Sequence, residues 1–363
     1  MATVLTGLPP RAHGTNQRDD ALGQGLTTLA ERLQKAGYAT AAFVTNPNLA
    51  PTFGFDQGFA AYSFLKEKRV ERGYVRSDVM HREALQWLEH DRPGDRPFFL
   101  YLHSMDPHDP YLTSGGEETV GTRSFMRALE QGRISVSPDL RQRLLALYDE
   151  GIAFNDTGIA ALLSRLDASG LGRDTLVVVM ADHGEEFFDH GWWRHGKTLF
   201  EEQLRIPLLV RWPGGWKTGV RVTGPARQID VVPTILEGVG LGAEAAGLPG
   251  RSLARLAAGN DRGEEPEFAL LDLDGRWVES LRLGPSKFVR YFSHDRSRGT
   301  EALFDLSADP LEKANVADGQ PESVAFLGAL LESPAFAGRA GAVGQASIDR
   351  ELAERLRAVG YVH

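Results

Sequence analysis

A short apolar run that ends in Asp182-His183-Gly184 most constrains how this chain folds. Residues 176–180 are one leucine, three valines and one methionine, and polar residues lie close on both sides. Such a run is typical of a strand buried on both faces. A carboxylate and an imidazole follow it, and Gly184 is expected to let the chain turn. Because ligands bind at the carboxyl ends of strands in open α/β sheets, this strand end is a candidate site.

The interval after this strand is unusually rich in polar groups. It contains His190, His195 and Lys197 and several acids, and a second apolar strand is predicted over residues 206–211. An isolated Asp-His-Gly is most often only a turn, and single histidines are usually surface or satisfied core residues. Three histidines with acids and a lysine between two strands are instead compatible with a metal or anion site.

The composition sets limits on the class of protein. The 363 residues are 42% hydrophobic and 25% charged, as in an ordinary soluble globular chain of one large domain or a large and a small one. Forty basic against forty-nine acidic residues give a net charge of -9, and no basic run indicates a nucleic-acid partner. There is no cysteine, no run long enough to span a membrane and no visible signal peptide. The compartment and the oligomeric state stay open.

Helices and strands are predicted to alternate through the first two thirds of the chain. This pattern predicts an α/β fold with a mostly parallel central sheet flanked by helices. Beyond it, short strands separated by Gly and Ser turns predict a smaller antiparallel sheet, followed by a terminal helix. The predicted domains are residues 1–245 and 246–363. The predicted helices cover 28–36, 77–90, 138–166 and 352–361, and the predicted strands cover 38–45, 98–102, 268–273, 281–283 and 288–292.

Several stretches, in order along the chain, resemble the sulfatase family of the alkaline-phosphatase superfamily. The match is most extensive over residues 182–214, where Asp-His-Gly, His-Gly-Lys, an acidic pair and Arg-Ile-Pro-Leu-Leu-Val-Arg-Trp-Pro-Gly follow one another. The other matching stretches are 6–14, 103–111, 228–235 and 301–315. The resemblance implies an alkaline-phosphatase-like fold and metal-dependent hydrolysis of a sulfate ester, whose substrate is a small molecule or a carbohydrate.

The resemblance also implies roles for individual residues. Asp182 and His183 would bind a divalent metal, for which Ca²⁺ is the family expectation. The imidazole ligand leaves Mn²⁺ or Zn²⁺ open. Lys197 would contact the sulfate, and His108, in the loop after strand 98–102, would face the ester. Either His108 or His195 could protonate the leaving oxygen, because an imidazole titrates near pH ~6.5. His190 is a further candidate for substrate contact.

Two departures from the family pattern limit this interpretation. Residues 6–14 resemble the stretch that follows the family's nucleophile, but the nucleophile signature and the metal-binding aspartate pair before it are not found. Where many sulfatases have Gly-Lys-Trp-His, this chain has Val44-Thr45-Asn46-Pro47. The 363 residues alone are therefore expected to bind an oxyanion without hydrolysing its ester. A phosphatase, phosphodiesterase or phosphonate hydrolase of the same superfamily and a non-catalytic anion-binding protein remain alternatives.

Overall fold

The chain forms two compact units, each built from segments that are far apart in the sequence. One unit comprises Met1–Leu29 and Asp174–Gly344, and the other comprises Ala30–Arg173 and Gln345–His363. A computed structural model describes residues 1–66, 75–112, 118–120, 125, 128–129, 131, 133–216, 218–260, 263–333 and 343–359. The domain boundary proposed near residue 245 stays a prediction.

A three-stranded parallel sheet forms the core of the unit that begins at Ala30. Its central strand β2 (Ala39–Val44) lies between β3 (Ala61–Phe64) and β4 (Phe98–His103). All six residues of β2 are buried, because both edges and both faces of a central strand are covered. The parallel pairing confirms the α/β class that alternating helices and strands predicted.

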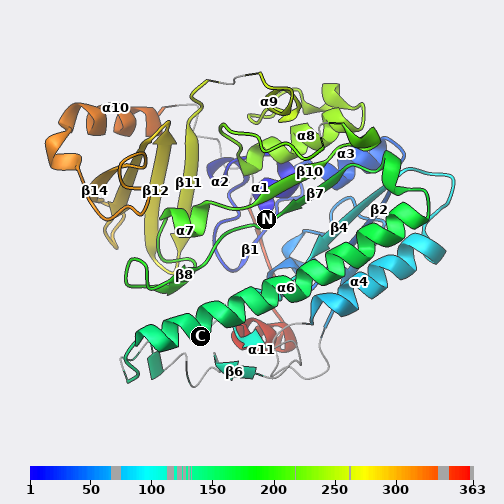
Figure 1. Cartoon of the computed structure of the whole chain (residues 1–363), viewed down its shortest axis with the longest axis horizontal. Helices are drawn as coiled ribbons and strands as arrows, with labels where there is room; N and C mark the ends of the chain where they lie inside the picture. Colours follow the sequence, from blue (N-terminus) through cyan, green and yellow to red (C-terminus); the bar gives the residue numbers. More distant parts are fainter. Residues whose placement is uncertain are drawn as a thin grey trace. The chain divides into compact units, whose positions relative to one another are not determined.

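Two helices of this unit, α4 (Ser77–Gln86) and α6 (Pro138–Ala168), lie side by side (Figure 1). The Ser137 side chain caps α6 by accepting the backbone N–H of Leu140 at 3.1 Å. Gly158 of α6 permits the close approach, since a Cβ there would lie 2.1 Å from Nδ1 of His81. Apolar residues of both helices join β2 in one core that includes Ala41, Phe43, Met80, Ala84, Trp87, Leu162 and Leu166.

The remaining elements of this unit are short. They are α3 (Leu29–Lys35, beginning at the unit boundary), η1 (Pro47–Leu49), η2 (Pro51–Phe53), η4 (Trp87–Asp91), β5 (Tyr111–Leu112), β6 (Glu118–Val120) and α11 (Arg350–Ala358), while η5 (Gly172–Asp174) and β15 (Gly344–Gln345) each cross the unit boundary. The helices predicted at 28–36, 77–90 and 138–166 thus exist within a few residues of their predicted bounds. Residues 360–361 of the predicted terminal helix lie outside the described residues.

The unit that begins at Met1 contains the strand before Asp182. This strand, β7 (Val177–Met180), pairs antiparallel with β10 (Leu208–Arg211), with Met180 opposite Leu208. The prediction of a strand buried on both faces is wrong, because all four β7 residues are only half-buried. On β10, Leu209 is 61% exposed.

A four-stranded antiparallel sheet forms the rest of this unit's framework. Its order follows the chain: β11 (Glu267–Leu273), β12 (Arg276–Leu283), β13 (Ser286–Phe292) and β14 (Arg298–Asp305). Alternate residues of β13 enter different cores. Phe288 packs with Leu327 and Leu331 of α10 (Pro321–Leu331), which covers one face of the sheet. Val289 packs with Leu199 on the other face.

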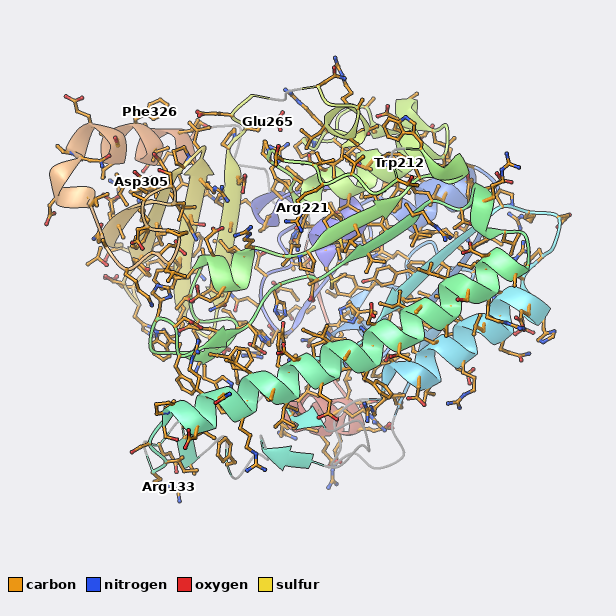
Figure 2. The ribbon with its side chains drawn as sticks, in the orientation of Figure 1. Arg133, Trp212, Arg221, Glu265, Asp305 and Phe326 are labelled. Carbon is orange, nitrogen blue, oxygen red and sulfur yellow. The ribbon has the colours of Figure 1, made fainter. Side chains whose placement is uncertain are left out.

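Figure 2 shows the side chains along these elements; Phe326 of α10 is 58% exposed. The shorter elements of this unit are α1 (Ala2–Thr6), α2 (Pro10–His13), β1 (Asp20–Ala21), β8 (Glu186–Phe187), β9 (Trp193–Arg194), α7 (Glu201–Leu204), α8 (Val231–Gly238) and α9 (Ala254–Ala257). It also contains η6 (Pro213–Gly215), η7 (Gln228–Asp230), η8 (Gly242–Ala245) and η9 (Ala317–Gly319). Within the described part of the chain, no helix is both long and apolar enough to cross a membrane.

Candidate active site

Asp182 and His183 lie immediately beyond β7, at the start of a segment that we call the site loop (residues 182–200). Hydrogen bonds between side chains and the backbone hold both in place: the Gln228 side-chain amide donates to the Asp182 carbonyl oxygen at 2.5 Å, and the His183 N–H donates to Asp182 Oδ1 at 3.1 Å. Nδ1 of His183 lies 2.8 Å from the Gly184 carbonyl oxygen, which can only accept. The proton therefore sits on Nδ1, and Nε2 presents its lone pair.

The remaining donor atoms of this pair converge. His183 Nε2 lies 3.8 Å from Asp182 Oδ1. Two ligands that each lie about 2.0–2.4 Å from one metal ion are separated by about 3–4 Å. An imidazole held in one tautomer by a backbone carbonyl is also the usual arrangement of a metal-binding histidine. The pair thus fits two adjacent positions of a coordination sphere.

The electrostatic environment of His183 is negative. Burial lowers the pKa of His183, but the Asp182 carboxylate, the Gly184 hydrogen bond and Glu185 together raise it above its ordinary value. The net direction shows that the carboxylates outweigh desolvation, so this position favours a cation.

His195 and Glu185 form a second pair within the site loop. His195 Nδ1 lies 2.9 Å from Glu185 Oε1, and the Glu185 side chain is buried. The His195 ring lies 4.1 Å from the His183 ring, centre to centre. Burial, with His183 as a further cause, holds the pKa of His195 well below its ordinary value. A neutral His195 that donates from Nδ1 to Glu185 keeps Nε2 as a proton acceptor.

A close approach of two backbone segments requires a glycine at position 184. Its N–H donates to the Gln203 carbonyl oxygen at 2.8 Å, and a Cβ at this position would lie 2.0 Å from the Glu202 carbonyl oxygen. Gly184 is not among the glycines with positive φ. The turn predicted at this glycine needs no left-handed conformation; what requires a glycine is the packing of the beginning of the site loop against α7.

Lys197 lies beside an exposed aromatic ring. Its Nζ is 5.1 Å from the centre of the Trp192 ring, and the Arg276 guanidinium is 4.8 Å from the same ring. Trp192 is 39% exposed, whereas most tryptophans are largely buried. Lys197 of the site loop and Arg276 of β12 thus lie against one aromatic side chain near the solvent.

His190 is engaged by protein groups on both sides of its ring. Nδ1 lies 2.6 Å from Glu202 Oε1, and Nε2 lies 3.3 Å from the Glu312 carbonyl oxygen. The ring stacks on Phe200 with centres 3.6 Å apart and planes inclined by 9°. These contacts fix the ring, so His190 connects the site loop to α7 and to residue 312.

Glu186, His190 and Glu202 form a second group close enough to share an ion, since their ligand atoms lie within 4.8 Å of one another. The donors around Glu186 argue against that use. Its Oε1 accepts the N–H groups of His190 and Trp192 at 3.0 and 2.8 Å. Its Oε2 accepts hydrogen bonds from the Thr198 hydroxyl and the Gln203 amide at 3.2 and 3.3 Å. A carboxylate surrounded by four donors organises a loop; a metal would have to displace these bonds.

His108 belongs to the other unit, where its loop is held rigidly. The residue is buried, and its Nδ1 lies 2.5 Å from the Asp109 carbonyl oxygen. Asp106, two residues earlier, accepts the N–H of Ser77 at 2.9 Å and pairs with Arg76. Burial raises the pKa of Asp106. These bonds tie the loop to the beginning of α4; the role of His108 towards an ester stays a prediction.

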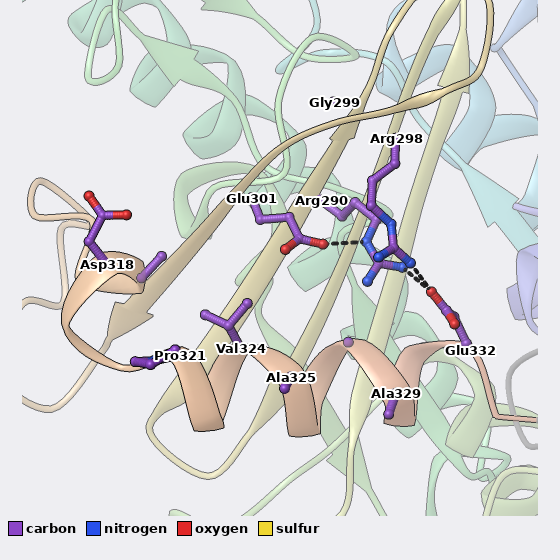
Figure 3. A pocket seen from close by; sticks show the side chains of 12 residues that line it. Arg290, Arg298, Gly299, Glu301, Asp318, Pro321, Val324, Ala325, Ala329 and Glu332 are labelled. Carbon is purple, nitrogen blue, oxygen red and sulfur yellow. Dashed lines mark hydrogen bonds and ion pairs between the residues drawn. The ribbon is translucent and has the colours of Figure 1, made fainter.

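A hollow in the unit that begins at Met1 belongs to neither pair. It has a volume of about 780 Å³ and is lined by β13, β14 and α10 (Figure 3). Arg290 and Arg298 both reach Glu332 there, and Arg290 also binds Glu301 at 2.9 Å. Both arginines on its wall are thus already paired with a carboxylate, which makes the hollow a poor site for an oxyanion.

Comparison with known proteins identifies the class to which this fold and strand end belong. The sulfatase profile matches residues 1–241, about two thirds of the chain, and the chain therefore belongs to the sulfatase family. Choline-sulfatase of Rhizobium meliloti (strain 1021) is 27% identical over 63% of this chain and 48% of its own length. Arylsulfatase K of Gallus gallus is 30% identical over 69% of this chain and 54% of its own length. The chain thus spans about half the length of these relatives.

Solved structures agree with this fold. A protein in complex with its substrate D-glucosamine-2-N,6-O-disulfate has a TM-score of 0.71 at 18% identity, covering 91% of this chain and 86% of its own. A phosphonate monoester hydrolase of Agrobacterium radiobacter has a TM-score of 0.69 at 20% identity, covering 91% and 83%. These likenesses confirm an alkaline-phosphatase-like α/β fold with a C-terminal antiparallel sheet, which has four strands where the described parallel sheet has three. Family membership also implies a divalent metal, which the donor geometry of Asp182 and His183 fits.

Sequence reasoning missed Glu185, Gln203 and Trp192. Glu185 and Gln203 act through contacts with residues 10 and 19 positions away, at His195 and Gly184. The available signal for Glu185 was the pair Glu185-Glu186 directly after Asp182-His183-Gly184. A buried carboxylate beside a histidine commonly orients the histidine ring.

Proposed function

We propose that the protein to which this chain belongs hydrolyses a sulfate ester with the help of a divalent metal. The observation that carries the proposal is the convergence of Asp182 Oδ1 and His183 Nε2, 3.8 Å apart, at the carboxyl end of β7. A metal held there would neutralise charge on the nonbridging sulfate oxygens. Ca²⁺ is the proposed ion, with Mn²⁺ or Zn²⁺ open because one ligand is an imidazole.

We propose a separate role for each of the other polar groups of the site loop. Lys197 is proposed to hold the sulfate through its ammonium group, which Trp192 orients. His195, oriented by Glu185, is proposed to accept a proton at Nε2 from the group that attacks the ester and then to pass that proton to the leaving oxygen. Because both nitrogens of His190 already face protein acceptors, we propose His190 as a positioning residue in place of a substrate ligand. We assign no attacking group.

The proposed substrate is a sulfated small molecule or carbohydrate. Support comes from the relatives, which are a choline-sulfatase and an arylsulfatase, and from the structural neighbour whose substrate is a disulfated glucosamine. The phosphonate monoester hydrolase has the same fold at 20% identity, so the fold alone does not separate the two esters.

The test uses protein purified from the cells that make it. Hydrolysis of 4-nitrophenyl sulfate and of a 4-nitrophenyl phosphonate monoester is measured before and after metal removal. We expect sulfatase activity that disappears with the metal and returns with Ca²⁺. Lys197→Met should lower kcat/KM about 100-fold or more, whereas Lys66→Met, which removes a lysine paired with Glu351 in the other unit, should not.

Three results would contradict the proposal. Phosphonate turnover above sulfate turnover would make this a phosphonate hydrolase. Sulfate binding with no turnover of any ester would leave an anion-binding protein. Equal effects of Lys197→Met and Lys66→Met would remove Lys197 from the site.

A further inference from the structure

A buried lysine in the C-terminal sheet contacts two carboxylates that border the site loop. Lys287 of β13 is 1% exposed, and its Nζ lies 3.0 Å from Glu201 Oε1 and 2.8 Å from Glu312 Oε1. Glu201 is the first residue of α7, directly after the site loop. Glu312 follows β14 and is itself buried.

Glu312 also binds the site loop and α7 through other atoms. Its second carboxylate oxygen accepts the backbone N–H of Glu201 at 2.6 Å, and its carbonyl oxygen faces His190 Nε2 at 3.3 Å. Its neighbour Lys313 donates to the carbonyl oxygen of Asp189. The backbone of Glu312 has a φ of 52°, a left-handed conformation that is uncommon for a side chain of this size. The contacts of residue 312 therefore reach positions 190 and 201, which enclose His195 and Lys197.

Stability alone gives little reason for this arrangement. Burying one ammonium and two carboxylates carries a large desolvation cost, and apolar residues of similar volume are often equally stable. Nearby, Leu199 already packs with Val289 and Phe304 of the same sheet without any charge. What the ion cluster adds to apolar packing is direction, because its bonds fix particular atoms of α7 and of residue 190.

We infer that Lys287, Glu201 and Glu312 form a clamp that positions the part of the site loop carrying His195 and Lys197. The clamp joins the C-terminal sheet to the site loop, so residues outside the matched family region shape the proposed site. These are positioning residues, since they act through the loop and not on a substrate. The consequence for oxyanion binding rests on the function proposed above; the consequence for the loop does not.

Arg290 provides a matched control on the same strand. It is 4% exposed and, like Lys287, pairs with two carboxylates, Glu301 and Glu332. Because it is three residues from Lys287, it points to the opposite face of the sheet. There it lines the hollow beside α10 (Figure 3). Replacing either Lys287 or Arg290 removes one positive partner from two carboxylates. Of these two cations, only Lys287 contacts α7.

The experiment compares hydrogen exchange in Lys287→Met, Glu312→Gln and Arg290→Met, each in the full chain. We expect the first two to speed exchange at the Glu201 amide and in peptides covering 186–200 by about tenfold or more, as loss of a charge-assisted bond implies. Peptides of β11 and β12 should stay protected. Arg290→Met should leave 186–200 unchanged while it speeds exchange near residue 332.

Uniform acceleration by all three variants would overturn the inference, since the cluster would then be a general structural element. Unchanged exchange at 186–200 in Lys287→Met and Glu312→Gln would overturn it as well. If Lys287→Met does not fold, Glu312→Gln, which keeps the side-chain shape, decides alone.

A second readout separates this inference from the proposed function. The affinity for inorganic sulfate is measured by calorimetry for the same variants, and we expect a loss of about tenfold in Lys287→Met and none in Arg290→Met. If the unaltered protein binds no sulfate, the proposed function fails while the exchange result still decides on the clamp. If sulfate binds equally to both variants, the clamp does not position Lys197.

Discussion

Replacing Gly184 by alanine tests the packing that places Asp182 and His183. The added Cβ would lie 2.0 Å from the carbonyl oxygen of Glu202, which belongs to the backbone of α7 and cannot rotate away. To reach ordinary van der Waals contact, the beginning of the site loop and α7 must separate by roughly 1.4 Å. The hydrogen bond from the Gly184 N–H to the Gln203 carbonyl oxygen, now 2.8 Å long, would then be lost.

The expected cost has two parts. Overpacking costs about 1–3 kcal/mol, and the lost backbone hydrogen bond costs about 1 kcal/mol. For a unit of about 200 residues, a total near 2–4 kcal/mol lowers the thermal midpoint by roughly 5–15 °C. The affinity for Ca²⁺ should fall as well, because the displaced glycine directly follows both proposed metal ligands.

Calorimetry and Ca²⁺ titration measure both effects, with Gly25→Ala as the control. Gly25 has no positive φ, and a Cβ added there would have no neighbouring atom within 4 Å, so its replacement should change neither quantity. A Gly184→Ala protein with the midpoint and Ca²⁺ affinity of the control would refute the argument that close packing fixes this strand end.

Three further predictions concern single side chains. Burial lowers the pKa of His13 to about 3, so its contribution to stability is present above pH ~6.5 and is lost as the pH falls towards 3, where the unfolded chain takes up the proton first. The thermal midpoint of His13→Gln should therefore fall less steeply between those values, and an identical slope would contradict this. Trp192→Leu should weaken sulfate binding by Lys197 about 3–10-fold and Trp192→Phe should weaken it less, which calorimetry can measure; equal losses would argue against a cation–π role. Asp182→Asn should reduce the affinity for Ca²⁺ by more than the loss of about 10–100-fold that is typical when a residue hydrogen-bonded to a metal ligand is replaced. An unchanged affinity would exclude Asp182 as a ligand.

The sequence predicted helices and strands well where apolar residues form one continuous run or recur at a single helical spacing. The run before Asp182 and the run in β2 both formed strands, and the long apolar row of α6 formed one helix. The burial of β7 was not predictable in the same way. A run of β-branched residues shows that a strand forms, but the half-buried state of β7 depends on which elements cover it.

The candidate site was predictable only in part, for a physical reason. Asp182 and His183 are adjacent in sequence, so the role that we propose for both is visible in a motif. The partners that orient the site loop are distant: Glu312 contacts residues more than a hundred positions away, and Lys287 lies on a strand of another sheet. No local period encodes such pairs, and a buried lysine has the same sequence signature as an exposed one.

The most direct test of the central claim is to locate the metal. Crystals of the protein grown with Mn²⁺ allow the ion to be placed from its anomalous scattering. We expect a peak about 2.0–2.4 Å from a carboxylate oxygen of Asp182 and from Nε2 of His183. A peak held by Glu186, His190 and Glu202, or no peak at Asp182 and His183, would contradict it.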